Sequence, residues 1–316
     1  MKRSPAPVTK RLSAFVISTL IANVIAILLR ICNLNWFYDI ELGYYKSSAF
    51  LPILGNVLLT VFAVGIAVFA RFVFIKDELT LPKPTLLPRL VAILPATGAL
   101  LAAIGMILNG NAEDYISALP FQVSTLFGAY AVFAVITAAF FFLLAAGILQ
   151  RPKRGGLILL LGLFSILFFV AALAVAYFDF EVQMNSPNKL IFQLACLSAM
   201  LALLADMRIL ADAQKPRFSL FAFSLATLFL GSSSVPSVFA YMKGIFPSDY
   251  RNLLADFVCM ALWCYCLIRL IWIAYPSEEK KAESPAEEAT EEVQETMSEE
   301  PLPETDPQEI KTENTD

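Results

Sequence analysis

Two charged side chains are the first candidates for chemistry inside an otherwise apolar sequence. Asp206 and Arg269 lie 16 and 17 residues after the starts of their apolar runs, at Leu190 and Asn252. A helical rise of about 1.5 Å per residue places both roughly 24–26 Å below the same membrane boundary, if both runs cross in one direction. The spacing therefore predicts a structural ion pair between Asp206 and Arg269. The alternative is that Arg269 snorkels to the headgroups beside Trp272.

Two asparagines form the second candidate pair. Asn23 and Asn56 lie within the first and second apolar runs. Counting from opposite boundaries places them within about one helical turn of each other in depth. We predict a hydrogen bond between the two helices, worth roughly 1 kcal/mol. Contact with a substrate is the alternative reading.

A run of serines before a proline is the third candidate. Residues 231–236 read Gly-Ser-Ser-Ser-Val-Pro within the seventh apolar run. Proline removes a helix donor, and serine hydroxyls can bond the freed carbonyl groups, so the pattern predicts a kink or a break. Interrupted helices often build substrate sites in transporters, although an ordinary proline kink is the alternative. The expected substrate-binding residues are Asn56, Gly231, Ser232, Ser233, Ser234 and Pro236.

Several kinds of chemistry have no candidate residues. The chain has no histidine, which argues against H-E-x-x-H metalloproteases, Ser-His dyads and histidine-ligated haem. The cysteines have neither C-x-x-C nor zinc-site spacing, so we interpret them as small apolar filler. We expect no catalytic residue, no metal, no cofactor, no nucleic-acid partner and no enzymatic activity. The five cysteines are Cys32, Cys196, Cys259, Cys264 and Cys266.

Long apolar runs are the elements that must position these residues. The chain is 58% hydrophobic with a mean hydropathy of +0.69, more than a soluble domain can cover with polar groups. Each run is near or above the roughly 20 residues that a helix needs to cross a bilayer. We predict an all-α bundle of eight transmembrane helices with short loops, surrounded by the lipid bilayer. The runs are 12–30, 49–75, 88–109, 121–149, 156–178, 190–211, 218–241 and 252–275.

The basic residues between the runs predict the orientation. Sixteen Lys and Arg residues fall on the side that holds both termini, and five fall on the other side. Cytoplasmic loops carry the excess of basic residues, so both termini are expected in the cytoplasm. The compact loops suggest a bacterial cytoplasmic membrane. The expected parts are a basic N-terminus at 1–11, a transmembrane domain at 12–275 and a cytoplasmic tail at 276–316.

The tail differs sharply in composition from the rest of the chain. Residues 276–316 hold 15 acids and three bases, with five prolines and no aromatic residue. Such a segment cannot bury enough apolar surface to offset its ordering entropy, so we expect disorder. Its charge of −12 could attract a basic protein partner or the basic rim of the same chain.

Two functions fit this pattern, and the sequence leaves both open. Eight spans with one expected interruption and no central charge favour a transporter or permease for a neutral or lipid-like small molecule. The alternative is a non-catalytic membrane scaffold or sensor, in which the acidic tail regulates the protein or binds a partner.

Overall fold

The computed structural model describes residues 6–39, 43–46, 49–73, 81, 83–109, 121–150, 155–178, 186–213, 215–246 and 253–275. The chain divides into two units, residues 1–275 and 276–316. The predicted acidic tail and residues 1–5 of the predicted N-terminal segment lie outside the described residues.

The first unit is a helical bundle, which confirms the predicted all-α class. Among the described residues, eight helical segments are long and apolar enough to cross a membrane. This supports a multi-pass membrane protein. The helices are α1 (Ala6–Phe37), α2 (Phe50–Val73), α3 (Leu86–Val91), α4 (Ile93–Asn109), α6 (Phe121–Ala145), α7 (Gly155–Phe178), α8 (Pro187–Leu210), α9 (Pro216–Met242) and α10 (Leu253–Ala274).

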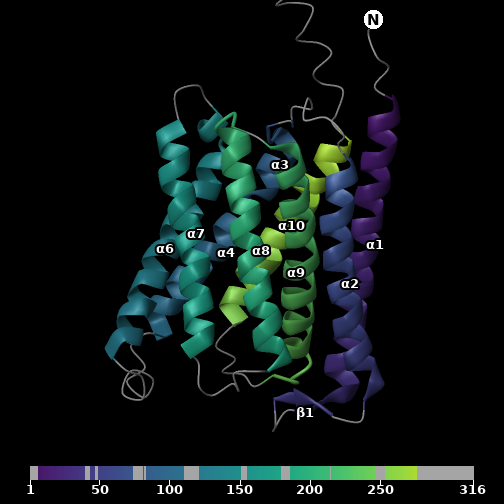
Figure 1. Cartoon of the computed structure of the whole chain (residues 1–316). Coiled ribbons are helices and arrows are strands. Elements are labelled where there is room, and N and C mark those ends of the chain that lie inside the picture. The colour runs from purple at the N-terminus through teal and green to yellow at the C-terminus, as the bar shows by residue number, and fades with distance from the viewer. Residues whose placement is uncertain are drawn as a thin grey trace, which may run out of the picture. The chain divides into compact units, whose positions relative to one another are not determined.

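Two small elements complete the bundle. The 3-10 helix η1 (Ile148–Gln150) follows α6. Strands β1 (Tyr38–Asp39) and β2 (Tyr44–Tyr45) form an antiparallel hairpin between α1 and α2. We call the end of the bundle with this hairpin the hairpin end, and the end where α1 begins the amino end. Figure 1 shows the two ends at the bottom and the top of the view.

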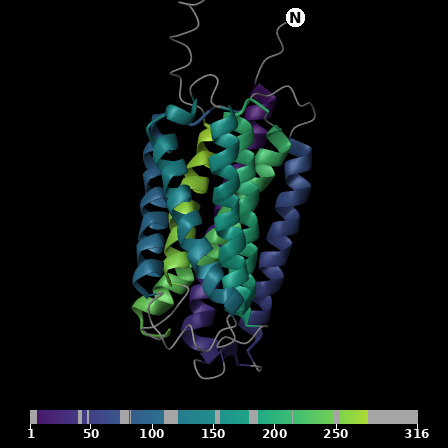
Figure 2. The same cartoon turned by 90° about the vertical axis from the view of Figure 1, so that its left-hand side faces the viewer.

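The local sequence explains where several helices begin. Proline opens α8 and α9, where its fixed φ suits the first turn and its missing N–H removes no helix bond. The interiors are apolar, so backbone groups must bond within each helix when water is absent. Most successive helices are antiparallel neighbours, but α2 packs against α1 and α9 and not closely against α3 or α4. Helix α10 ends at the amino end (Figure 2).

Helices α9 and α10 form the centre of the bundle. Helix α9 packs against α1, α2, α8 and α10, and α10 also contacts α3, α4 and α8. Small residues allow the close approach of α4 to α10, because a Cβ on Gly98 would lie 3.5 Å from Ala261 Cβ. Helix α2 lies at the periphery and is the least buried of the spans. The interior polar groups therefore gather around the two central helices.

The helix interruption lies in the third apolar run and not in the seventh. Helix α9 continues through Pro236, whereas the third run divides at Ala92 into α3 and α4. Pro95 has no N–H for the carbonyl of Val91, which lies four residues earlier. In α9 the hydroxyls of Ser232, Ser234 and Ser237 bond the carbonyls of Phe229, Leu230 and Ser233, and the helix continues through Pro236.

Candidate functional site

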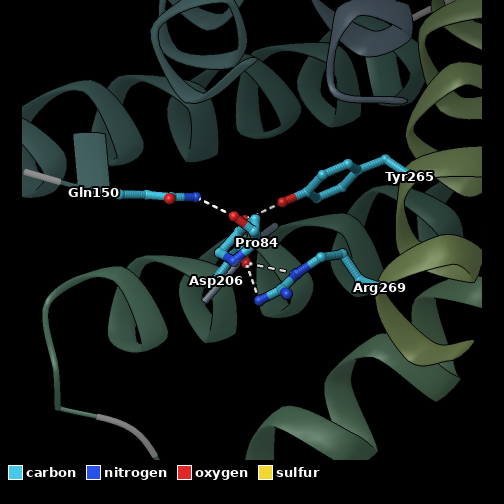
Figure 3. Close-up of polar contacts among 5 residues, drawn as sticks. All are labelled: Pro84, Gln150, Asp206, Tyr265 and Arg269. Atoms are coloured by element: carbon cyan, nitrogen blue, oxygen red, sulfur yellow. Dashed lines mark hydrogen bonds and ion pairs between the residues drawn. The ribbon is translucent and has the colours of Figure 1, made fainter. Parts of the chain in front are cut away.

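An ion pair joins α8 to α10 inside the bundle, and we call it the ion-pair cluster (Asp206, Tyr265 and Arg269). Asp206 Oδ1 lies 2.9 Å from Arg269 Nη2 and 3.2 Å from Arg269 Nε. The Tyr265 hydroxyl donates to Asp206 Oδ2, as Figure 3 shows. The structure thus brings together the two charges that equal depth predicted to pair. It also adds Tyr265, which the sequence did not single out.

The surroundings of the ion-pair cluster are apolar and closed. Arg269 is 0% exposed and Asp206 is 1% exposed. The guanidinium carbon lies 5.5 Å from the centre of the Phe223 ring on α9. The ring of Phe141 on α6 meets Tyr265 edge-on at 5.5 Å. Four helices therefore enclose the pair, and loss of either charge would remove the ion pair of the other in a dry environment.

Polar contacts also join neighbouring segments at the amino end. The side chain of Gln150 in η1 donates to the carbonyl of Pro84, just before α3 (Figure 3). Arg89 on α3 donates through Nε to the carbonyl of Ala145, 3.2 Å away at the end of α6. A cation at this position complements the C-terminal end of the helix dipole. These contacts attach the interrupted third span to α6.

A second group, the asparagine cluster (Asn23, Thr227, Gly231 and Trp263), joins α1, α9 and α10. Asn23 Nδ2 donates to the Thr227 carbonyl at 2.6 Å, and Trp263 Nε1 donates to Asn23 Oδ1 at 3.2 Å. A Cβ on Gly231 would lie 2.5 Å from Trp263 Nε1 and 2.6 Å from Asn23 Nδ2. Glycine at position 231 therefore makes room for this three-helix contact.

The predicted hydrogen bond between Asn23 and Asn56 does not form. Asn23 faces α9 and α10, whereas Asn56 lies on the exposed surface of α2. Equal depth is necessary for such a bond, but each side chain must also point toward the other helix. The same exposure removes Asn56 from the interior, where we expected it to contact a substrate.

Two serines of the α9 segment bond carbonyl groups of their own helix. Ser232 donates to the Phe229 carbonyl at 3.3 Å, and Ser234 donates to the Leu230 carbonyl at 2.7 Å. Gly231, Ser233 and Pro236 are buried within the same helix. These bonds stay within α9 and occupy the hydroxyl groups of Ser232 and Ser234. The substrate role of residues 231–236 stays a prediction.

A third group was missed by the sequence reasoning. We call it the thiol–phenol cluster (Tyr130, Cys196, Asp256 and Cys259), and α6, α8 and α10 supply it. Tyr130 lies within electrostatic reach of the other three residues, and the Cys196 and Cys259 side chains are neighbours. Tyr130 and both cysteines are at most 1% exposed.

The Tyr130 hydroxyl is the clearest sign of a binding site. It is buried, and among the described residues it has no hydrogen-bond partner. The ring is held by a stacked contact with Phe168, with centroids 4.8 Å apart and an angle of 15° between the planes. Most buried hydroxyl groups are hydrogen-bonded, so an unpaired one requires an explanation such as a missing occupant.

The thiol–phenol cluster offers groups that can bind a small molecule. No group of three or more metal-ligating side chains occurs within the part of the chain that the structure describes. A phenol and a carboxyl group offer hydrogen bonds, and the thiols and Phe168 offer soft apolar walls. Such a mixture suits a small molecule that is largely apolar and has a few polar atoms.

A fourth group, the hairpin cluster (Arg30, Tyr38, Tyr45 and Asn188), lies at the hairpin end. Arg30 Nη1 donates to the Tyr45 hydroxyl at 3.2 Å, and Nη2 donates to Asn188 Oδ1 at 2.5 Å. Burial raises the pKa of Tyr38, and its hydrogen bond with Asn188 lowers that pKa by a smaller amount. The phenol therefore stays protonated at neutral pH. These contacts attach the hairpin to α1 and α8.

No family model, no curated protein and no solved structure matches the chain. Its function must therefore be inferred from the chemistry of these four clusters.

Proposed function

We propose that the chain is a membrane transporter or permease for a small neutral or lipid-like molecule, which binds at the thiol–phenol cluster. The observation that carries this proposal is the buried Tyr130 hydroxyl, which has no hydrogen-bond partner among the described residues. A bound molecule with one polar atom would satisfy this hydroxyl while its apolar part packs against Phe168.

The positions of the clusters along α10 support a transport mechanism. Cys259 lies near the hairpin end of α10, and Arg269 lies ten residues further on, toward the amino end. At about 1.5 Å per residue, roughly 15 Å separates the two levels. In the proposed mechanism the ion-pair cluster lies between the bound molecule and the amino end, and it closes that end of the bundle. Separation of α8 from α10 at the ion pair then opens that side, while the hairpin end closes.

The ion-pair cluster supports a neutral substrate. The interior Arg269 guanidinium is already paired with Asp206, so neither of these two groups is available to neutralise an ion, and Asp256 is the carboxyl group within the proposed site. We propose that the amino end faces the cytoplasm, with both termini of the chain there, and the positive-inside pattern of the sequence supports this orientation. The compact loops support a bacterial cytoplasmic membrane. In this orientation the thiol–phenol cluster lies in the outer half of the bilayer.

The experiment uses the purified full-length chain in liposomes. Stopped-flow light scattering measures glycerol and urea entry, and dithionite quenching measures the flipping of a fluorescent phosphatidylcholine. We expect at least one of these probes to move faster than in protein-free liposomes. Tyr130→Phe removes only the hydroxyl and should reduce that flux at least about fivefold, since one hydrogen bond is worth about 1 kcal/mol.

Ser232→Ala is the matched control for this experiment. It also removes a buried hydroxyl, but that hydroxyl bonds within its own helix. The control should retain the flux of the wild-type chain. No flux of any probe, or equal flux in the Tyr130→Phe variant, would contradict the proposal.

The tail supports a second candidate function, a membrane scaffold or sensor. The tail has a charge of −12, and the same chain has basic segments between its apolar runs. It could therefore bind a basic partner or fold back onto those segments. Truncation after Tyr275 tests this function by pull-down with a basic peptide and by comparison of the flux above. Unchanged binding and unchanged flux would remove the tail from the functional account.

A further inference from the structure

The outward face of α2 carries a polar side chain where lipid is expected. Helix α2 is the most peripheral span, and Asn56 lies six residues after its first residue, Phe50. This places the amide about 9 Å along the helix, below the boundary of the hydrocarbon region. Asn56 is exposed, and its side chain has no hydrogen bond to another described residue. Its neighbours Ile53 and Val57 are exposed apolar residues.

An amide in this position favours a protein neighbour over lipid. Lipid tails cannot donate or accept hydrogen bonds, and the short side chain of asparagine cannot reach far toward the headgroups. The other exposed polar residue of this face, Thr60, bonds the carbonyl of Asn56 at 2.9 Å, so its hydroxyl is satisfied within α2. The Asn56 amide is thus the group on this face that requires a partner.

The shape of the same face permits close helix packing. Asn56, Thr60, Val64 and Val68 follow one another at intervals of four residues, and all are exposed. Residues with this spacing form one ridge along a helix surface. Their side chains are short or β-branched, so a second helix can approach closely and lose little side-chain entropy. The larger Phe69 and Phe72 lie beyond the ridge, toward the amino end of the bundle.

We propose that α2 is a dimer interface, in which the Asn56 amides of two copies of this chain bond to each other. An amide carries both donors and an acceptor, so two copies related by a twofold axis can form two reciprocal hydrogen bonds. The partner is a second copy of this chain because the Asn56 amide is complementary to the same amide at the same position of another copy. The ridge from Asn56 to Val68 then lies along the crossing of the two helices.

The test measures dimerisation of the full-length chain in lipid. Fluorophore-labelled protein is reconstituted into large liposomes over a range of protein densities, and single-molecule photobleaching gives the dimer fraction. Two hydrogen bonds between helices predict that Asn56→Leu lowers the association constant about tenfold. Asn56→Gln keeps an amide and should retain part of the association. Val64→Trp places a bulky group on the ridge and should also weaken the dimer.

Thr97→Val is the matched control. Thr97 is an exposed polar residue on α4, and its hydroxyl bonds the carbonyls of Ile93 and Leu94 within the helix. This variant should dimerise like the wild type. Circular dichroism in detergent checks that every variant is folded, as expected for changes at exposed positions. A wild-type chain that is monomeric at all densities would overturn the proposal. A dimer that is unaffected by Asn56→Leu or by Val64→Trp would overturn it as well.

Discussion

Replacing Arg269 by methionine removes one partner of the ion-pair cluster while keeping an unbranched apolar side chain. Asp206 then loses both of its contacts with the guanidinium, at 2.9 and 3.2 Å, and keeps only the hydroxyl of Tyr265. Removal of one partner from a buried pair costs about 3–5 kcal/mol in known cases. Because both contacts share one carboxylate oxygen, we expect a loss at the lower end, about 3 kcal/mol in the free energy of unfolding.

The double variant Asp206→Leu/Arg269→Met should not lose the stability that the single variant loses. It removes both charges together, so no charge stays buried without a partner. Replacement of a buried pair by apolar residues is often neutral or stabilising. The double variant should therefore lie within about 1 kcal/mol of the wild type, even though each single change is strongly destabilising.

Unfolding in mixed micelles, titrated with SDS, measures these free energies. Trp263 and Trp272 are on α10 itself, so their fluorescence reports on the helix that carries Arg269. Lys83→Met is the control, since its ion pair with Asp212 is 38% and 70% exposed and should contribute less than about 1 kcal/mol. The reasoning fails if Arg269→Met costs no more than Lys83→Met, or if the double variant is as unstable as the single one.

Three further expectations follow from the close contacts in the bundle. Gly231→Ala inserts a Cβ 2.5 Å from Trp263 Nε1 in the asparagine cluster and should lower the free energy of unfolding by about 1–3 kcal/mol in the same assay. Gly65→Ala is its control, because a Cβ there meets open space and should be neutral or stabilising. Gly147 has a φ of 72°, and its Cβ would lie 2.5 Å from the Arg89 guanidinium, so Gly147→Ala should destabilise the bundle by at least about 1 kcal/mol. Arg30→Met removes the hydrogen bonds that attach the hairpin to α1 and α8, so amide hydrogen exchange in the two strands should become faster. Unchanged exchange would mean that the strands are stable without these bonds.

Counting residues from the span boundaries predicted the depth of a side chain in the membrane, but it did not predict which way the side chain points. The method placed Asp206 and Arg269 at one level, and the structure brings them into contact because α8 and α10 are both interior helices. It also placed Asn23 and Asn56 at one level, yet Asn56 points away from the bundle. Spans that are apolar on all sides show little periodicity, so the sequence does not indicate which face of α2 is buried.

The thiol–phenol cluster was missed because its members look apolar or peripheral when each is considered alone. Tyr130, Cys196 and Cys259 lie about 9–14 Å along three spans that all start at the hairpin end. The depth count that paired the two charges could therefore have grouped these residues too. The position of the helix interruption was harder to predict. Both Pro95 and Pro236 lack an N–H, and only the tertiary structure shows which helix divides.

Helix α10 supplies residues to three interior clusters, whereas α2 supplies none. This difference affects how freely the sequence of each helix can vary. Each of these α10 residues must suit a partner on α1, α6 or α8, so accepted changes there require compensating changes on the partner helix. Most outward positions of α2 are exposed in the described part of the chain and can exchange one apolar residue for another independently. Sequence drift should therefore be slow and correlated around α10 and fast and independent along α2, with position 56 as the exception.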